Sequence, residues 1–256
     1  MTPTEKNTTQ SIAVNWEKIE CPVCGYDSFS HVFNKNDEPF VRCDYCSLLL
    51  INPRPVYEQV LDTYSKDYSK KYAKKSEKKL RRCRRWVARA KKSNRIEGRW
   101  LDVGCSVGFV VKAASDLGLD AFGVDVEHWG VEYGREKLHL KNLYTGSLED
   151  QNFPDGYFSG ISLYDVIEHV PDLNRLTKEL KRILAHNGII DIITPDLGHW
   201  RVPADLSTWN EIKPSEHLYY FSEDTLSRLM QKHGLKIIKK RFYIKPSLRV
   251  YITHAD

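Results

Sequence analysis

The sequence lacks any long apolar run, and its first residues lack the layout of a secretion signal. No stretch of the 256 residues approaches the roughly 18 apolar residues that a membrane-spanning helix needs. The opening residues, MTPTEKNTTQ, are polar and show no basic segment followed by an apolar one. These absences argue against a membrane span and predict a cytoplasmic protein, with residues 1–17 as a flexible tail.

Cysteine is scarce, and four of the six cysteines form two matched pairs. Cys21 and Cys24 are followed by Cys43 and Cys46, in the spacing C-x2-C-x18-C-x2-C. Six cysteines in a chain of this kind favour metal binding over a disulfide framework. Each C-x2-C pair can aim two thiolates at one point, and two pairs complete the tetrahedron that Zn²⁺ prefers. Because the protein fills all four positions, the pattern predicts a closed, structural zinc site in a ribbon over residues 18–52.

Acidic residues are rare in one strongly basic segment. Residues 66–99 contain 16 Lys and Arg against three acids, a local charge of +13 in a chain whose net charge is only +5. Apolar residues at helical spacing predict an amphipathic helix within a basic connector over residues 53–97. This helix either lies across the following domain as a solvated surface element or contacts an anionic partner such as a nucleotide-sugar phosphate, nucleic acid or acidic glycan. Aromatic residues are interleaved, without a recognised nucleic-acid motif, at Tyr64, Tyr68, Tyr72 and Trp86.

A strand, a glycine turn, a helix and a second strand are predicted in succession near the middle of the chain. Residues 100–103 form a short apolar run closed by Gly104, and residues 109–117 carry apolar side chains at helical spacing. Residues 121–124 predict the second strand, which ends at Asp125. An acid in this place accepts hydrogen bonds from the hydroxyl pair of a ribose, so the segment predicts half of a nucleoside-binding α/β sheet.

The glycine turn lacks the G-x-G-x-x-G pattern of dinucleotide-binding folds. Gly104 and Gly108 bracket the turn, Ser106 lies between them, and Asp102 precedes them. A carboxylate there would repel a pyrophosphate, but it suits the cationic amino-acid end of S-adenosylmethionine. The run L-D-V-G-C-S-V-G resembles the first motif, approximately L-D-x-G-C-G-x-G, of the class I S-adenosylmethionine-dependent methyltransferases. The resemblance implies a Rossmann-like, seven-stranded α/β sheet in a methyltransferase domain over residues 98–256.

The same resemblance implies a cofactor site at the carboxyl ends of the strands. In the family's pattern, Leu148 and Glu149 line the adenine pocket, and the end of the fourth strand stands beside the cofactor. The residues expected to contact S-adenosylmethionine are Asp102, Gly104, Cys105, Ser106, Gly108, Asp125, Val126, Leu148, Glu149, Leu163, Tyr164 and Asp165.

Further motifs narrow the resemblance to a subgroup with an N-terminal zinc ribbon. Residues 164–172 are close to the family's D-V-I-E-H-V-x-D, and residues 216–222 are close to its E-H-L-x-Y-F-S. The first cysteine knuckle and the N-P-R-P turn at residues 52–55 are similar to those of bacterial enzymes that methylate nucleotide-linked sugars, cell-surface glycans and related small metabolites. The resemblance covers nearly the whole chain from Cys21 onward and implies a small-molecule, nucleotide-sugar or glycan acceptor.

Residues 195–216 form a long segment with Trp and Pro that predicts a functional lid. His217 follows this segment and titrates near neutral pH, so we expect it to abstract or orient the acceptor's proton. An anchoring role for His217, through hydrogen bonds that hold the lid, is an equal alternative. Glu216, Tyr219 and His169 are the other catalytic candidates.

Two other functions stay open at this point. An RNA methyltransferase is favoured by the basic segment and by zinc ribbons in enzymes that modify ribosomal RNA. A non-catalytic, zinc-dependent binding protein is favoured only by Ser106 and Ser159, which depart from the family's usual residues. Steeply salt-dependent RNA binding would favour the first, and failure to bind S-adenosylmethionine would favour the second.

Overall fold

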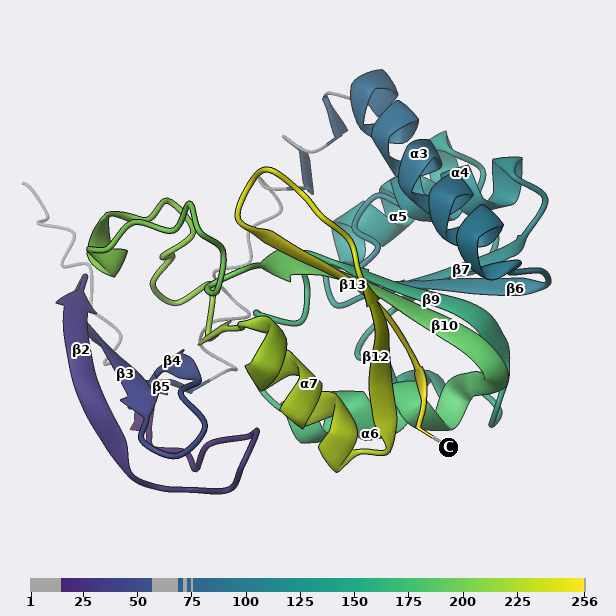
Figure 1. Cartoon of the computed structure of the whole chain (residues 1–256). Coiled ribbons are helices and arrows are strands. Elements are labelled where there is room, and N and C mark those ends of the chain that lie inside the picture. The colour runs from purple at the N-terminus through teal and green to yellow at the C-terminus, as the bar shows by residue number, and fades with distance from the viewer. Residues whose placement is uncertain (1–14, 57–68, 71–72, 75, 256) are drawn as a thin grey trace, which may run out of the picture.

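The largest element of the molecule is a seven-stranded sheet (Figure 1). The computed structural model describes residues 15–56, 69–70, 73–74 and 76–255. The strands of this sheet are β6 (Arg99–Val103), β7 (Asp120–Asp125), β8 (Leu143–Thr145), β9 (Phe158–Tyr164), β10 (Leu184–Pro195), β12 (Leu235–Lys240) and β13 (Ser247–His254). Their order is β12-β13-β10-β9-β6-β7-β8, with parallel pairing from β10 to β8 and with β13 antiparallel to both of its neighbours. This arrangement confirms the predicted Rossmann-like sheet.

Side chains alternate along the strands and build an apolar core on each face of the sheet. The helices are α3 (Ser76–Asn94), α4 (Phe109–Asp116), α5 (His128–Lys137), α6 (Leu173–Ile183) and α7 (Glu223–Lys232). Trp100 of β6 packs with α3, α4 and α5 on one face, and Leu101 packs with α6 and α7 on the other (Figure 1). The basic helix α3 buries Cys83, Val87 and Ala90, which are members of the apolar stripe predicted from its sequence.

A second sheet of four strands carries the cysteine pairs. The strands β2 (Phe29–Lys35), β3 (Glu38–Cys43) and β4 (Leu49–Ile51) form an antiparallel ribbon within the predicted residues 18–52. The fourth strand, β11 (Tyr219–Tyr220), lies far along the chain and pairs antiparallel with β4. The ribbon and the larger domain are therefore joined by backbone hydrogen bonds within one sheet.

The segment over residues 195–216 packs against this ribbon. Trp209 is buried with Phe40 in a third apolar core. The carboxylate of Glu38 in β3 accepts hydrogen bonds from the backbone N–H of Ser215, at 2.7 Å, and from the Ser215 hydroxyl. A lid function for this segment stays a prediction, and its described position is against the ribbon.

The remaining short elements are β1 (Trp16–Glu17), which pairs with β5 (Arg54–Pro55), and the 3-10 helices η1 (Glu149–Gln151) and η2 (Leu206–Thr208). The helix α6 ends at Ile183, because Leu184 already pairs with Phe158 as the first residue of β10. Tyr64, Tyr68, Tyr72 and most of the tail predicted at 1–17 lie outside the described residues. Across the part of the chain that the structure describes, every helix is too short or too polar to cross a membrane.

Candidate active site

The glycine turn between β6 and α4 brings the backbone to the carboxyl edge of the sheet. The N–H groups of Gly104 and Cys105 donate to the carbonyl oxygen of Val124, at 2.8 and 3.0 Å. Gly104 has a φ of +71°, and a Cβ there would lie 2.4 Å from a methyl carbon of Val166. Both the backbone conformation and the available space therefore require glycine. The Ser106 hydroxyl is buried and has no hydrogen-bond partner among the described residues, so it is free to bond to a ligand.

Asp125 ends β7 and holds the glycine turn with its carboxylate. Its Oδ2 accepts a hydrogen bond from the N–H of Ser106 at 2.7 Å, and its Oδ1 accepts one from the N–H of Glu127 at 2.8 Å. Each carboxylate oxygen has a second lone pair that can accept a ribose hydroxyl. Burial raises the pKa of Asp125, and the two backbone N–H groups oppose that rise. Val126 is 44% exposed beside this acid and offers an apolar surface to a bound base.

Asp102 lies under α3 at the end of β6. It is buried, and it accepts a hydrogen bond from the Ser162 hydroxyl at 2.6 Å. Burial raises the pKa of Asp102 to about 8, the Ser162 hydroxyl opposes the rise, and the charge of Asp125 adds to it. A positive charge brought close to Asp102 would restore the ionised carboxylate. Contact between Asp102 and the cationic end of a ligand stays a prediction.

The other predicted cofactor residues divide into accessible and internal ones. Gly108 has a φ of +83° at the start of α4. The N–H of Gly146 donates to the carbonyl oxygen of Asp125 at 2.9 Å, which brings the turn before Leu148 and Glu149 to the predicted ribose site. Leu148 is buried, whereas Glu149 is half-buried.

Three predicted residues are used inside the protein. Cys105 and Leu163 are buried in the two cores that cover the sheet. The Tyr164 hydroxyl donates to Oδ2 of Asp191 at 2.8 Å, and the Tyr164 ring meets the Trp86 ring edge-on at 5.1 Å. The packing of these three side chains stabilises the carboxyl edge of the sheet. Only the next residue, Asp165, is exposed there, with a φ of +58°.

Glu168, His169 and His217 meet beyond the carboxyl ends of β9 and β10. Their potential ligand atoms all lie within 4.8 Å of one another, and the two imidazole rings are 4.6 Å apart, edge to face. Oε2 of Glu168 accepts a hydrogen bond from the Thr194 hydroxyl at 2.9 Å, and Nδ1 of His169 donates to the Glu216 carbonyl at 2.7 Å. Oε1 of Glu168 and Nδ1 of His217 are buried and have no hydrogen-bond partner among the described residues.

Burial controls the protonation of this cluster. It raises the pKa of Glu168 to about 8, and the charge of Asp165 adds to that rise. It lowers the pKa of His169 to about 4 and that of His217 to about 2. The charge of Lys213 contributes to both decreases, and the charge of His169 contributes more to that of His217. Both imidazole rings are therefore neutral at pH 7 and present nitrogen lone pairs.

The predicted catalytic residues occupy different environments. His217 and His169 lie in the cluster. The side chain of Glu216 is exposed, and its carbonyl rather than its carboxylate contacts His169. The Tyr219 hydroxyl donates to the Pro171 carbonyl at 2.9 Å and accepts a hydrogen bond from Arg54 at 2.6 Å. The carboxylate beside His217 is instead that of Glu168, which lies directly before His169 in the D-V-I-E-H-V motif.

Arginine and aromatic side chains lie around Asp165. The guanidinium carbon of Arg249 is 3.4 Å from the ring centre of Tyr243 and 5.5 Å from that of Trp86. The guanidinium carbon of Arg82 is 4.8 Å from the same Trp86 ring. Both arginines act on Asp165 electrostatically. This side of the edge is therefore cationic and has flat aromatic surfaces.

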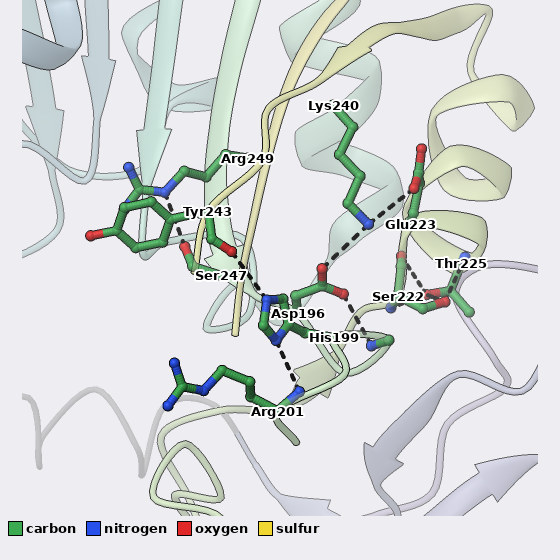
Figure 2. Close-up of polar contacts among 11 residues, drawn as sticks. Asp196, His199, Arg201, Ser222, Glu223, Thr225, Lys240, Tyr243, Ser247 and Arg249 are labelled. Carbon is green, nitrogen blue, oxygen red and sulfur yellow. Dashed lines mark hydrogen bonds and ion pairs between the residues drawn. The ribbon is translucent and has the colours of Figure 1, made fainter. Parts of the chain in front are cut away.

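The turn after β10 is fastened to the C-terminal elements, as Figure 2 shows. Asp196 forms an ion pair with Lys240 at 3.4 Å, and Lys240 forms another with Glu223 at 3.0 Å. The Nε2 of His199 donates to the Tyr243 carbonyl at 3.1 Å. These contacts fix the beginning of the predicted lid to β12, whose Lys240 also contacts α7, and to the loop that precedes β13.

The four predicted zinc ligands converge at one end of the ribbon. The Sγ atoms of Cys21 and Cys46 are 3.4 Å apart, and those of Cys24 and Cys43 are 3.5 Å apart. All four sulfurs lie within 4.8 Å of one another. A tetrahedral zinc site with ordinary Zn–S bonds has sulfurs about 3.8 Å apart. The geometry and the donor set therefore fit Zn²⁺.

The sheet order, the glycine turn and the acid at the end of β7 define the Rossmann-like fold of the methyltransferases. The profile of the methyltransferase domain family matches residues 72–240, and the chain belongs to this family.

Solved structures share this fold at low sequence identity. A SAM-dependent methyltransferase from Leishmania major has a TM-score of 0.59 and 14% identity, covering 77% of this chain and 82% of that one. An S-adenosylmethionine-dependent methyltransferase from Clostridium acetobutylicum has a TM-score of 0.56 and 12% identity, covering 73% and 99%. The glycopeptide N-methyltransferase MtfA, complexed with sinefungin, has a TM-score of 0.52 and 13% identity, covering 66% and 85%.

Curated relatives match a shorter region. A ubiquinone biosynthesis O-methyltransferase from Rhodopseudomonas palustris is 27% identical over 116 residues, which are 44% of this chain and 46% of the relative. The enzyme of the same name from Bradyrhizobium diazoefficiens is 28% identical over the same shares. The chain thus spans less than half the length of the curated relatives that it matches.

Proposed function

We propose that this protein transfers a methyl group from S-adenosylmethionine to a hydroxyl oxygen of a small anionic acceptor, such as a nucleotide-linked sugar. One observation carries the proposal: the Ser106–Asp125 unit and the Glu168–His169–His217 cluster share the carboxyl edge of neighbouring strands. The Ser106–Asp125 unit is suited to binding a nucleoside. The Glu168–His169–His217 cluster is suited to binding a group that must lose a proton. The O-methyltransferases among the relatives support oxygen as the methylated atom.

When bound, S-adenosylmethionine supplies a methyl group on a positively charged sulfur. Asp125 accepts hydrogen bonds from the ribose hydroxyls, the Gly104 turn admits the ligand close to the backbone, and Asp102 faces the cationic end. The cluster that contains His217 orients the acceptor hydroxyl. The acceptor oxygen would attack the methyl carbon in line, its proton would pass to solvent, and the sulfonium sulfur would take the electron pair of the broken carbon–sulfur bond and leave as a neutral thioether.

The arginine and aromatic group around Asp165 supports an anionic acceptor. Arg249 is 9% exposed and is stacked on Tyr243, so its guanidinium group is held in place before a ligand arrives. Arg82 on α3 brings a second cation to the same edge. Guanidinium groups bind phosphate oxygens in pairs, and the half-buried Trp86 ring lies between the two arginines.

Within the same proposal, Cys21, Cys24, Cys43 and Cys46 hold a structural Zn²⁺. The metal stabilises a ribbon that is too small to fold around its own core. Through β11 the ribbon also positions His217, which lies two residues before that strand. A cytoplasmic location accords with six free cysteines.

Two measurements test the function. Calorimetry should show S-adenosylmethionine binding to the wild-type protein, and tritium from the labelled methyl group should pass to a member of a nucleoside-diphosphate-sugar panel. Arg249→Met should weaken acceptor binding about 10-fold or more and leave cofactor binding unchanged, because a charged hydrogen bond contributes about 1.5–3 kcal/mol. Arg228→Met, which changes an exposed arginine on α7, is the matched control. Failure to bind the cofactor would refute the proposal.

A second candidate is an RNA methyltransferase, and one surface favours it. Lys78, Arg81, Arg84 and Arg85 line a shallow depression on α3. Such a surface would bind a phosphate backbone with an affinity that falls steeply with salt. Labelled methyl transfer to RNA, together with such a salt dependence, would favour this candidate over the sugar nucleotide.

A further inference from the structure

The Glu168–His169–His217 cluster contains two buried polar atoms without partners. Glu168 is fully buried and His217 is 2% exposed, yet Oε1 of Glu168 and Nδ1 of His217 find no hydrogen-bond partner among the described residues. Leaving such an atom unpaired costs about 1–3 kcal/mol. Two of them beside each other indicate a ligand that satisfies both.

A hydrogen bond fixes the tautomer of His169 so that its Nε2 can bind a ligand. Its Nδ1 is close to the Glu216 carbonyl oxygen, which can only accept, so Nδ1 carries the hydrogen and Nε2 carries the lone pair. A metal-binding histidine is usually held in this manner by a hydrogen bond from its other nitrogen. Oε2 of Glu168 is held in turn by Thr194. The surrounding contacts therefore orient both side chains.

The charges around the cluster also favour a cation. Burial and the charge of Asp165 oppose ionisation of Glu168, and a divalent ion beside its carboxylate would offset both effects. Lys213 acts in the opposite direction, but its ammonium group lies 3.6 Å from the carboxylate of Glu211. His169 is only half-buried and Asp165 is exposed, which gives an ion and an acceptor a route from solvent.

We propose that Glu168, His169 and His217 bind a divalent transition-metal ion that holds the acceptor hydroxyl for methylation. Two imidazole nitrogens and one carboxylate are a ligand set for Zn²⁺, Mn²⁺ or Fe²⁺ that leaves coordination positions open. The role in catalysis rests on the proposed function, whereas the binding of the ion does not. The metal-bound hydroxyl gives its proton to solvent, its oxygen forms the bond to the methyl carbon, and the sulfonium sulfur leaves as a neutral thioether.

This ion is distinct from the zinc proposed in the ribbon. Four thiolates form a soft, closed site that discriminates against Mn²⁺, whereas imidazole and carboxylate accept it. Electron paramagnetic resonance with Mn²⁺ as the probe therefore observes the Glu168 cluster alone. Elemental analysis of the zinc-supplemented protein should find two zinc ions per chain.

Glu168→Gln and His217→Asn should weaken Mn²⁺ binding at least about 10-fold and reduce the zinc content from two ions to one. The matched controls are Glu179→Gln on α6 and His233→Asn after α7, which should keep wild-type metal binding. Cofactor binding, followed by calorimetry, should be unchanged in Glu168→Gln, and its circular dichroism should show that it is folded.

The outcomes separate the two proposals. A wild-type protein that binds no Mn²⁺ and holds a single zinc ion would overturn the metal site, and so would Glu168→Gln with undiminished Mn²⁺ affinity. Metal binding without methyl transfer to any acceptor would keep the site and reject the proposed function. Methyl transfer at an equal rate in wild-type protein and Glu168→Gln, with and without added Mn²⁺, would reject the catalytic role of the ion.

Discussion

The carboxylate of Asp125 accepts a hydrogen bond from the backbone N–H of Ser106 at 2.7 Å. This single contact joins the end of β7 to the glycine turn that follows β6. In the proposed function Asp125 binds a ribose, and this contact fixes its carboxylate and the glycine turn relative to each other. A change at Asp125 should consequently affect both the shape and the binding strength of the site.

Asp125→Asn should weaken S-adenosylmethionine binding by about 10-fold or more. Asparagine retains one oxygen acceptor, but its amide group opposes one of the two backbone N–H donors and removes the charge that strengthens the ribose bonds. Isothermal calorimetry measures the loss. Asp120→Asn, at the exposed start of the same strand, should bind the cofactor as the wild type does. Equal affinities for the two variants would contradict the assignment of Asp125.

Gly104→Ala should unfold more readily than the wild type by more than about 2 kcal/mol and should not bind the cofactor. The methyl group would meet Val166 at 2.4 Å in a backbone conformation that alanine disfavours. Gly118→Ala provides the matched control, since Gly118 has a φ of +79° and no atom lies within 4 Å of the place that its methyl group would take. Its cost should be only about 1–2 kcal/mol, from the conformation alone. Urea denaturation measures the loss of unfolding free energy in each variant. Equal losses would show that Val166 can move aside without destabilising the protein.

Asp102 should make the free protein less stable as pH rises. Its pKa is near 3.8 when unfolded and about 8 when folded, so between these values the folded state binds a proton that the unfolded state releases. The free energy of unfolding should therefore decrease as pH rises. The contribution of this residue to that decrease should approach about 1.4 kcal/mol per pH unit. Asp102→Asn should remove that contribution, and denaturation at a series of pH values measures it. A cationic cofactor should also bind more tightly as pH rises toward 8, with release of a proton. An unchanged pH slope in Asp102→Asn would rule out this assignment.

Removing zinc from the four-cysteine site should destabilise more than the ribbon. Cys21→Ser should lower the zinc content by one ion per chain and lower the melting temperature. It should also alter the surroundings of Tyr219 and Tyr220, because β11 pairs with β4. Cys83→Ala changes a buried cysteine in α3 and should keep the zinc while it loses some core packing. Elemental analysis, differential scanning calorimetry and tyrosine fluorescence check these outcomes. A Cys21→Ser protein with wild-type zinc content would exclude this ligand set.

Local patterns predicted much of the fold. The βαβ unit around Gly104 could be predicted because its strand, turn and helix signals are contiguous, and the cysteine spacing indicated where the sulfurs meet. The boundary at Ile183 could not be predicted, because the pairing of Leu184 with Phe158 is a tertiary contact that overrides local helix preference.

The candidate site was less accessible to prediction from sequence. His169 and His217 were both selected, but their contact spans a long stretch of chain that neither periodicity nor spacing describes. Glu168 and His169 are adjacent in the sequence and are not expected to share a helix face, so their spacing alone did not predict that both would belong to one site. Only the fold shows that Thr194 holds one oxygen of Glu168 while the other has no partner among the described residues.

Because β11 pairs with β4, the ribbon cannot be separated from the methyltransferase domain without breaking a sheet. A gene segment that encodes only residues 18–52 could not be moved as a cassette to another enzyme, because the recipient would lack the strand that completes the sheet. Excision of the same segment would leave backbone N–H and C=O groups of Tyr219 and Tyr220 without the partners that β4 provides. Unpaired strand edges of this kind promote aggregation. The ribbon and the methyltransferase domain therefore depend on each other for one shared sheet, and removing either part would leave a strand of the other unpaired.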